Sequence, residues 1–109
     1  MLMLALRPPE WLTLWLAQHE LKAYTSFTIA NKERIRVELA RVRSQSWALS
    51  EQQLELNHRG TAVPLRDRHG NVVGALSATM PMGYESSEDV GARVLPVLRE
   101  TAQAMRNLI

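Results

Sequence analysis

The chain has 109 residues, of which 46% are hydrophobic and 22% are charged, with a formal net charge of +2 and no cysteine. This length predicts one domain at most, and the composition is typical of a soluble globular protein. The absence of cysteine excludes disulfides and thiolate metal sites and is compatible with a reducing cytoplasm, while so small a net charge gives no support to nucleic-acid binding by these residues.

The chain opens with a short apolar segment. Residues 1–6 are apolar, and a Pro-Pro pair follows them after one arginine. The run is too short for a membrane span or a signal sequence, so we expect a buried strand there. Pro8-Pro9-Glu10 is typical of a helix start, and this helix should extend to about Gln18. Its Trp11 and Trp15 lie four residues apart, which favours core packing over an aromatic binding site.

The next helix is predicted over residues 32–45. An extended segment at 25–29 precedes it, and Asn31 is well suited to cap its first turn. Its remaining face carries arginines interleaved with Glu38, a spacing that indicates a solvated, ion-paired surface rather than a helix that reads DNA. The apolar stripe of this helix consists of Ile35, Leu39 and Val42.

A short strand and a β-hairpin follow. Residues 47–50 are predicted as the strand, and 51–59 as a loop or an irregular strand in which Asn57 can take a left-handed turn conformation. The runs 60–66 and 72–79 are rich in Val, Ala, Thr and Leu, and the polar segment between them contains a Gly-Asn pair. This composition predicts two strands joined by a tight connection.

The hairpin separates small side chains from larger ones. A four-residue loop over 67–70 would place Gly60 opposite Ser77. Pro64 cannot donate a ladder hydrogen bond, so the first strand should lie at a sheet edge or be bulged there. On this register one face carries Gly60, Ala62, Pro64, Val73, Ala75, Ser77 and Thr79, whereas the other, an ordinary core face, carries Thr61, Val63, Leu65, Val72, Gly74, Leu76 and Ala78.

The face of small residues allows two interpretations. Its side chains could pack closely against a helix, or they could line a cavity that ends in the hydroxyls of Ser77 and Thr79. Periodicity alone favours close packing against a helix.

The last helix is predicted from Ser86 or Ser87 to about Asn107, with acidic residues suited to its first turn. Pro96 should kink or split this helix, because its nitrogen cannot bond to the preceding turn. The stripe of the helix that faces the core comprises Val90, Val94, Val97, Leu98, Thr101, Met105 and Leu108. Together the elements predict an α+β fold in which helices pack on a mostly antiparallel sheet.

The sequence contains no pattern typical of catalysis or metal binding. The three histidines are far apart and lack the spacing of metal ligands. Ser77 has no nearby base, no glycine-rich phosphate loop is present, and no pair of carboxylates is placed for acid–base chemistry. We therefore predict a domain that is not an enzyme and uses no cofactor or metal.

Three segments together resemble a known family. They are residues 34–49, with Leu39-Ala40-Arg41-Val42-Arg43 and Trp47-Ala48-Leu49, residues 55–67, and residues 70–77 with the closing helix. In this order and spacing they resemble the C-terminal part of the effector-binding domain of IclR-family transcriptional regulators. The resemblance extends over essentially the whole chain and is strongest to the subgroup that controls protocatechuate and 4-hydroxybenzoate catabolism.

The resemblance implies that residues 1–109 are part of a GAF-like domain that binds a small organic or aromatic acid in the cytoplasm. It implies effector contacts at Ser50, Gly60, Ser77 and Thr79. It also implies that the winged helix-turn-helix of the family is absent, so that DNA would be bound only through that missing domain. The chain departs from the family pattern at Ser50, where many relatives are acidic, and at Gly60, where they have Cys or Ser.

Two functional hypotheses follow. The first is a ligand-sensing part of a transcription regulator, which forms homo-oligomers and controls a DNA-binding domain outside these residues. The second is an interaction module that only oligomerises through its exposed sheet edge and binds no ligand. Neither hypothesis involves a membrane.

Overall fold

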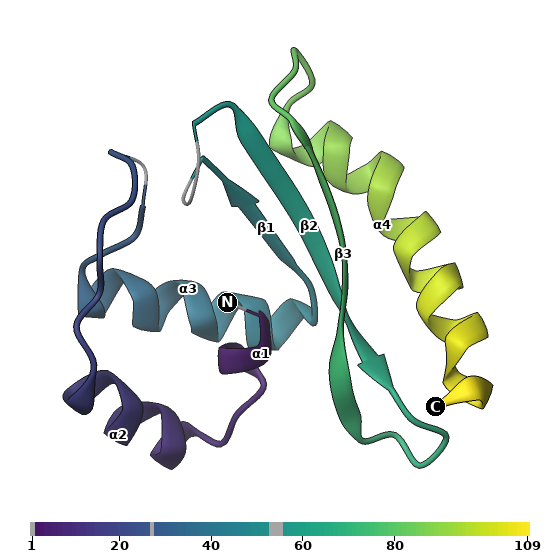
Figure 1. The fold of residues 1–109 in the computed structure, drawn as a ribbon, viewed down its shortest axis with the longest axis horizontal. Helices are drawn as coiled ribbons and strands as arrows, with labels where there is room; N and C mark the ends of the chain where they lie inside the picture. The colour runs from purple at the N-terminus through teal and green to yellow at the C-terminus, as the bar shows by residue number, and fades with distance from the viewer. Residues whose placement is uncertain (1, 27, 53–55) are drawn as a thin grey trace.

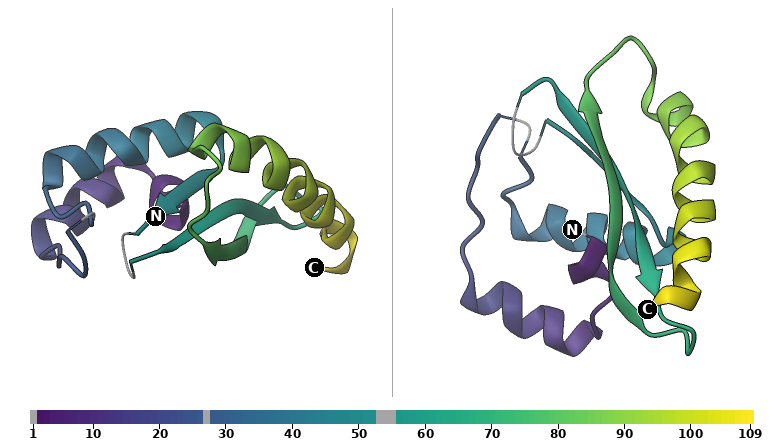
Figure 2. Two further views of the ribbon diagram at one scale, coloured as in Figure 1. Left: turned by 90° about the horizontal axis from the view of Figure 1, so that it is seen from above. Right: turned by 45° about the vertical axis from the view of Figure 1, so that its right-hand side comes forward.

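A three-stranded antiparallel sheet forms the middle layer of the protein, with a long helix on one side and three shorter helices on the other (Figures 1 and 2). The computed structural model describes residues 2–26, 28–52 and 56–109. The elements are α1 (Leu2–Ala5), α2 (Pro9–Gln18), α3 (Lys32–Gln45), β1 (Ala48–Glu51), β2 (His58–Arg66), β3 (Val72–Pro81), α4 (Ser87–Met105) and a 3₁₀ turn η1 (Arg106–Leu108). The predicted α+β architecture is confirmed.

The first apolar run is a helical turn, so the predicted strand at 1–6 is wrong. Leu2 and Ala5 are each 3% exposed and pack in one cluster with residues of α2 and α3. Leu, Met and Ala are strong helix formers and none of them is β-branched, while a spacing of three residues places Leu2 and Ala5 on one helical face. A short apolar run alone does not distinguish the two conformations.

Helix α2 has the predicted bounds, but its tryptophans lie nearer the surface than expected. Trp11 is 37% exposed, and the Arg7 guanidinium lies 4.9 Å from its ring centroid. Trp15 packs partly against the core and stacks on His19 at 4.4 Å between ring centroids. Only Leu16 of this helix is fully buried, because α2 covers the margin of the molecule rather than its centre (Figure 1).

The segment before α3 is a turn rather than an extended strand. The hydroxyl of Thr28 accepts hydrogen bonds from the backbone N–H groups of Tyr24 and Thr25, at 3.1 and 3.0 Å. Phe27, in the same predicted segment, lies outside the described residues. Hydroxyl side chains that bond the nearby backbone favour turns over ladders.

Helix α3 follows the prediction closely. The Asn31 side chain accepts hydrogen bonds from the backbone N–H groups of Glu33 and Arg34, at 2.9 and 3.1 Å. On the outer face Arg41 pairs with Glu38 at 2.6 Å, as expected of a solvated surface. The predicted apolar stripe of Ile35, Leu39 and Val42 is buried throughout.

The hairpin turn is one residue longer than predicted. The Asp67 carboxylate accepts hydrogen bonds from the backbone N–H groups of His69 and Asn71, at 2.8 and 3.0 Å, and the Asp67 N–H donates to the Asn71 carbonyl. These backbone hydrogen bonds, that of Asn71 above all, hold the pKa of the Asp67 carboxyl below its usual value. As a result Arg66 lies opposite Val72.

The predicted pairing is displaced by two residues, yet the predicted faces are correct. The longer turn shifts the register by one residue, and a bulge between Leu65 and Arg66 shifts it by one more. Gly60 therefore lies opposite Thr79 rather than Ser77. Because side chains alternate with a period of two, an even shift keeps every residue beyond the bulge on its predicted side of the sheet.

Strand β2 is the central strand of the sheet and not an edge strand, but its Pro64 lies beyond the end of β1. The register of β1 with β2 ends where Ala48 faces Ala62. At Pro64 β2 therefore has only β3 beside it among the described residues, and the missing N–H of Pro64 disrupts no pairing with β1. The bulge that was expected at Pro64 lies one residue further along the strand.

Helix α4 covers the face of larger residues. Val63 of β2 packs with the buried residues of α4, and Leu76, Ala78 and Trp47 adjoin this cluster. The predicted cap is confirmed, since the Ser86 hydroxyl accepts from the Asp89 N–H at 3.1 Å. The helix continues through Pro96 without a break, so the predicted split is absent. Buried α4 residues are Val90, Gly91, Val94 and Leu98, whereas Val97 and Leu108, predicted in the stripe, are exposed.

Thr61 provides a test of this packing. It is fully buried on the side of β2 that faces α4, and its hydroxyl has no hydrogen-bond partner among the described residues. We expect Thr61→Val to raise the free energy of unfolding by about 1 kcal/mol, because the substitution removes a desolvated polar group without opening a cavity. Urea denaturation measures the difference, and a loss of more than about 1 kcal/mol would show that the hydroxyl is satisfied.

Candidate functional site

The four residues singled out from the sequence lie together on one face of the sheet. Ser50 of β1 faces Gly60 of β2, and Gly60 faces Thr79 of β3, so that these three residues form one row across the sheet. Ser77 belongs to the next row, opposite Ala62. Three separate strands thus bring Ser50, Gly60, Ser77 and Thr79 to one surface, although 29 positions separate the first of them from the last.

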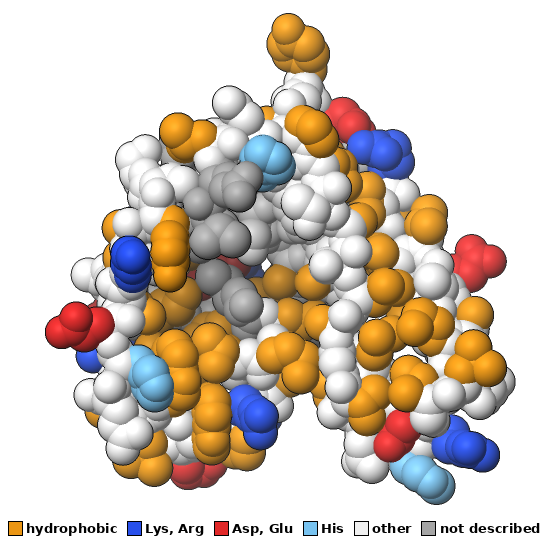
Figure 3. Space-filling view, in the orientation of Figure 1, with side chains coloured by type: hydrophobic (Ala, Val, Ile, Leu, Met, Phe, Trp, Pro, Cys, Tyr) orange, Lys and Arg blue, Asp and Glu red, His pale blue; other side chains and the backbone are white. Residues whose placement is uncertain are grey.

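The floor of this surface is made of small side chains. Ala48 is buried and Ala62 partly buried, and both pack with the cluster formed by α1, α2 and α3. Ala75, Ser77 and Thr79 on β3 are exposed. The N-terminal helices therefore cover the alanine end of the surface and leave the end with Ser77 and Thr79 exposed. The first end fits the interpretation of close packing against a helix, and the second fits that of accessible hydroxyls. The space-filling view shows the molecule hollowed between the N-terminal helices and the strands (Figure 3).

Gly60 keeps the centre of the surface low. A Cβ atom built on Gly60 would lie 3.6 Å from the Thr79 hydroxyl oxygen and 3.5 Å from the Ala78 carbonyl oxygen. These are ordinary van der Waals distances, so the backbone tolerates a side chain at this position. The glycine therefore leaves open a space directly beside the Thr79 hydroxyl.

The chemistry of the surface is that of neutral hydrogen-bond donors. The hydroxyls of Ser50, Ser77 and Thr79 have no hydrogen-bond partner in the part of the chain that the structure describes, and no charged residue shares their face within β1, β2 and β3. Such an arrangement can donate hydrogen bonds to a carboxylate or carbonyl while small apolar side chains contact a flat ring.

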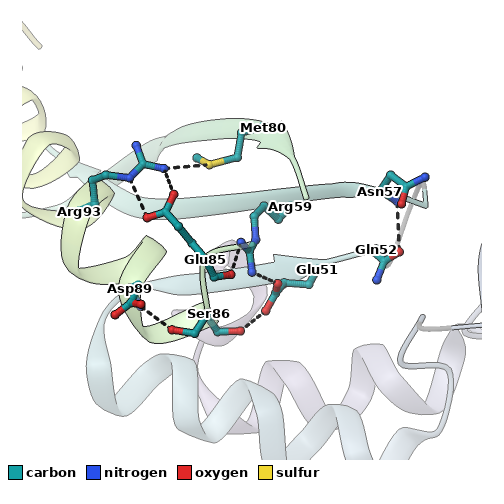
Figure 4. A network of polar contacts seen from close by, with 10 residues as sticks. Glu51, Gln52, Asn57, Arg59, Met80, Glu85, Ser86, Asp89 and Arg93 are labelled. Carbon is teal, nitrogen blue, oxygen red and sulfur yellow. Dashed lines mark hydrogen bonds and ion pairs between the residues drawn. The ribbon is translucent and has the colours of Figure 1, made fainter. Parts of the chain in front are cut away.

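A buried ion pair supports this surface from the opposite side of the sheet (Figure 4). Arg59 is only 3% exposed and donates hydrogen bonds to the Glu51 carboxylate and, at 3.0 Å, to the Glu85 carbonyl. The Ser87 hydroxyl donates to the same carboxylate. Arg93 forms a two-point contact with the Glu85 carboxylate, at 3.0 and 2.7 Å. This network joins the ends of β1 and β2 to the start of α4.

The sequence reasoning missed this network. Arg59 alternates in phase with Thr61 and Val63, so the period of the strand alone places a guanidinium on the core face. A buried arginine needs an acidic partner, and Glu51 stands at the end of the neighbouring strand. An arginine on the core face of one strand and a glutamate at the end of its neighbour could therefore have predicted the ion pair from the sequence.

The network also affects the titration of Glu51. Burial alone would raise the pKa of the Glu51 carboxyl, but the hydrogen bonds from Ser87 and Arg59 and the charge of Arg59 outweigh burial and hold the pKa below its usual value of 4.5. A carboxyl whose pKa is lower in the folded state stabilises the fold above its unfolded-state pKa. This stabilisation is lost as the pH falls through the folded-state pKa.

We expect Glu51→Gln to destabilise the protein by about 2 kcal/mol at pH 7, because it leaves the Arg59 charge buried without a counter-charge. The difference from the wild type should shrink as the pH falls below 4.5. Urea denaturation across this range measures both. The control is Glu38→Gln, which breaks an ion pair on the outer face of α3 and should cost only about 0.3 kcal/mol. Equal effects of the two variants would contradict the role of the network.

Comparison with known proteins identifies the family. Residues 1–107 match the family model of the bacterial transcriptional regulator IclR C-terminal domain. The chain belongs to the IclR C-terminal family. The Pca operon regulatory protein of Acinetobacter baylyi is 32% identical over 95 residues, which are 87% of this chain and 34% of that protein. The p-hydroxybenzoate hydroxylase transcriptional activator of the same organism is 30% identical over 95 residues, 87% of this chain and 35% of that protein.

The fold of this IclR-family chain is also similar to solved structures. The inducer-binding domain of a PobR double mutant from Acinetobacter, in complex with 3-hydroxybenzoic acid, superposes with a TM-score of 0.92 at 29% identity, over 99% of this chain and 62% of that one. These relatives are transcriptional regulators rather than enzymes. The chain spans about a third of the length of the two curated relatives. Within the described residues no helix is long and apolar enough to cross a membrane.

Proposed function

We propose that this chain is the C-terminal part of the effector-binding domain of a transcription regulator, and that it binds a small organic or aromatic acid on the surface formed by Ser50, Gly60, Ser77 and Thr79. The observation that carries the proposal is the convergence of a glycine and three hydroxyls on one partly open face, where the hydroxyls have no hydrogen-bond partner among the described residues. Support comes from the PobR inducer-binding domain, a fold neighbour that holds 3-hydroxybenzoic acid.

Hydroxyl donors and a small-residue floor suit an aromatic acid. Ser77 and Thr79 are two residues apart on β3, so both project to the same side of the strand. Each can donate to a ligand carboxylate, and a hydrogen bond to a charged acceptor contributes about 1.5–3 kcal/mol. The small side chains of Ala62 and Ala75 on the same face would obstruct an aromatic ring little.

The proposed role of binding is to bias the arrangement of DNA-binding domains that lie outside these 109 residues. A ligand shifts an equilibrium between two arrangements only by its difference in affinity for them. A ligand that contacts β1, β2 and β3 together favours the arrangement in which the rows of the sheet stay in register. Oligomers of the chain would transmit this preference to DNA-binding domains on neighbouring subunits.

One observation favours a second candidate function. Strand β3 is ten residues long and, among the described residues, pairs only with β2. An unpaired strand of this length presents backbone groups to which another chain can add a strand. In this alternative the chain is an interaction module that oligomerises through the β3 edge and binds no effector.

Removal of one hydroxyl tests the proposed site. We expect Ser77→Ala to weaken the binding of 3-hydroxybenzoic or protocatechuic acid about tenfold, which corresponds to the loss of one hydrogen bond to a carboxylate. Its thermal stability should stay unchanged, because Ser77 is exposed and its hydroxyl forms no hydrogen bond with a described residue. Titration calorimetry measures the affinity, and Ser44→Ala, at an exposed position of α3, is the control. Equal affinity of the two variants would contradict the site.

A graded series at Gly60 tests the space beside the hydroxyls. The expected order of affinity is Gly60, then Gly60→Ala, then Gly60→Val, because a Cβ fits at ordinary distances while the added methyl groups fill the centre of the surface. Valine favours strand conformation, so the melting temperature should not fall. Calorimetry with the same acids measures the series. Full affinity of the Gly60→Val variant would place the ligand elsewhere.

Self-association separates the two candidate functions. The interaction module predicts a sedimentation mass that rises with protein concentration and no effect of any aromatic or keto acid on the melting temperature. The effector-binding domain predicts a saturable rise of the melting temperature with at least one of these acids, whatever the mass. Absence of heat and of a melting shift with the whole panel, in a folded sample, would eliminate the effector proposal.

A further inference from the structure

A cavity lies at the end of the sheet where β2 extends beyond β1. Strand β1 begins opposite Ala62, so the end of β2 has no strand on that side among the described residues. The C-terminal half of α4 borders this gap on one side, and Ser46, the residue that follows α3, borders it on another. They leave a cavity of about 380 Å³. Figure 1 shows the end of α4 beside the β2–β3 hairpin.

Three arginines are among the residues that line this cavity. They are Arg66 of β2, Arg99 of α4 and Arg106 of η1, three elements that only the fold brings together. None of the three forms an ion pair within the described part of the chain, and no acidic residue lines the cavity. Three arginines with no ion-pair partner among the described residues thus border the cavity.

Two of the guanidinium groups are held in place by neutral partners. Arg66 donates to the Gly70 carbonyl at 3.1 Å, and the Arg106 Nε donates to the Asp67 carbonyl at 2.9 Å. Backbone carbonyls fix the orientation of these side chains but do not neutralise their charge, and several of their N–H groups have no partner among the residues that the structure describes. The Arg99 side chain makes no hydrogen bond with any described residue, so its donors are available to a ligand.

We propose that this cavity binds a small multiply charged oxyanion, of the phosphate-ester or polycarboxylate class. Guanidinium groups match the oxygen pairs of phosphate and carboxylate groups with two parallel hydrogen bonds. The hydroxyl of Ser46 and the amide of Gln103 supply neutral donors, while Val63, Pro64 and Ala102 form an apolar wall for the organic part of the ligand. A volume of this size accommodates a small metabolite. The site is independent of the proposed effector surface.

A purely structural role for the arginines predicts different behaviour. The C-terminal ends of α3 and α4 lie at this cavity, and the carbonyl groups of helix C-termini attract cations. In that case the three arginines would be occupied with helix ends, and an added anion would act on them only through general screening. Arg99 distinguishes the two roles because its side-chain donors make no hydrogen bond with any described residue.

The test is titration calorimetry of the 109-residue chain with pyrophosphate and, in a separate arm, with citrate, both at an ionic strength kept constant with potassium chloride. We expect saturable binding of at least one anion, and Arg99→Gln should weaken it about tenfold. The melting temperature of the Arg99→Gln variant without anion should equal that of the wild type. The arm that saturates identifies the class of oxyanion.

The matched control is Arg34→Gln, which removes the same charge from an exposed position on α3 far from the cavity. It should leave anion affinity within about twofold of the wild type. Three results would overturn the proposal: no saturable heat with either anion, equal weakening in both variants, or full affinity in the Arg99→Gln variant.

Discussion

The alternation of side chains along β2 divides the whole protein into two sides. Thr61 and Val63 point toward α4, and both are almost fully buried there. Gly60 and Ala62 point the other way, toward the N-terminal helices. Because the strand period is two, a slip of β2 by one residue would move all four of these residues to the other side. Close packing against α4 on one side therefore fixes a surface of small side chains on the other.

The buried pair of Arg59 and Glu51 adds a second constraint. A buried charge without a partner is costly, so the end of β1 must keep Glu51 beside Arg59. Ser50 and Gly60 are the sequence neighbours of these two residues and point to the opposite side of the sheet. The ion pair on the α4 side thus sets the position of two residues of the proposed effector surface, which it never touches.

Features that depend on local chemistry could be predicted from the sequence. Asn31 and Ser86 cap their helices because a side-chain oxygen can reach an unpaired N–H two or three residues on. The hairpin register could not be predicted, since it depends on how the Asp67 carboxylate bonds the turn and on a bulge that leaves no mark in composition. The assignment of Gly60, Ser77 and Thr79 to one face nevertheless holds, because the two one-residue shifts of the register sum to an even number.

The errors in the predicted core stripe of α4 came from tertiary packing, which the sequence of a single segment does not determine. Val97 fits a helical stripe with Val90 and Val94 by spacing alone, yet the sheet meets α4 on the side of Leu98, and Leu95 packs there instead. The three arginines of the cavity could not be associated from sequence for the same reason. They are separated by up to 40 positions, and only the gap beyond β1 brings them together.

The two proposed sites select ligands by different physical criteria. The surface around Ser77 offers neutral hydroxyls over a floor of small side chains, so shape and one carboxylate decide what binds there. The cavity of Arg66, Arg99 and Arg106 offers charge, so the number of oxygens on the ligand decides. Both sites use β2, through Gly60 in one and Arg66 in the other. If an oxyanion alters the affinity for an aromatic acid through this strand, thermodynamic linkage requires the acid to alter the affinity for the oxyanion by the same factor.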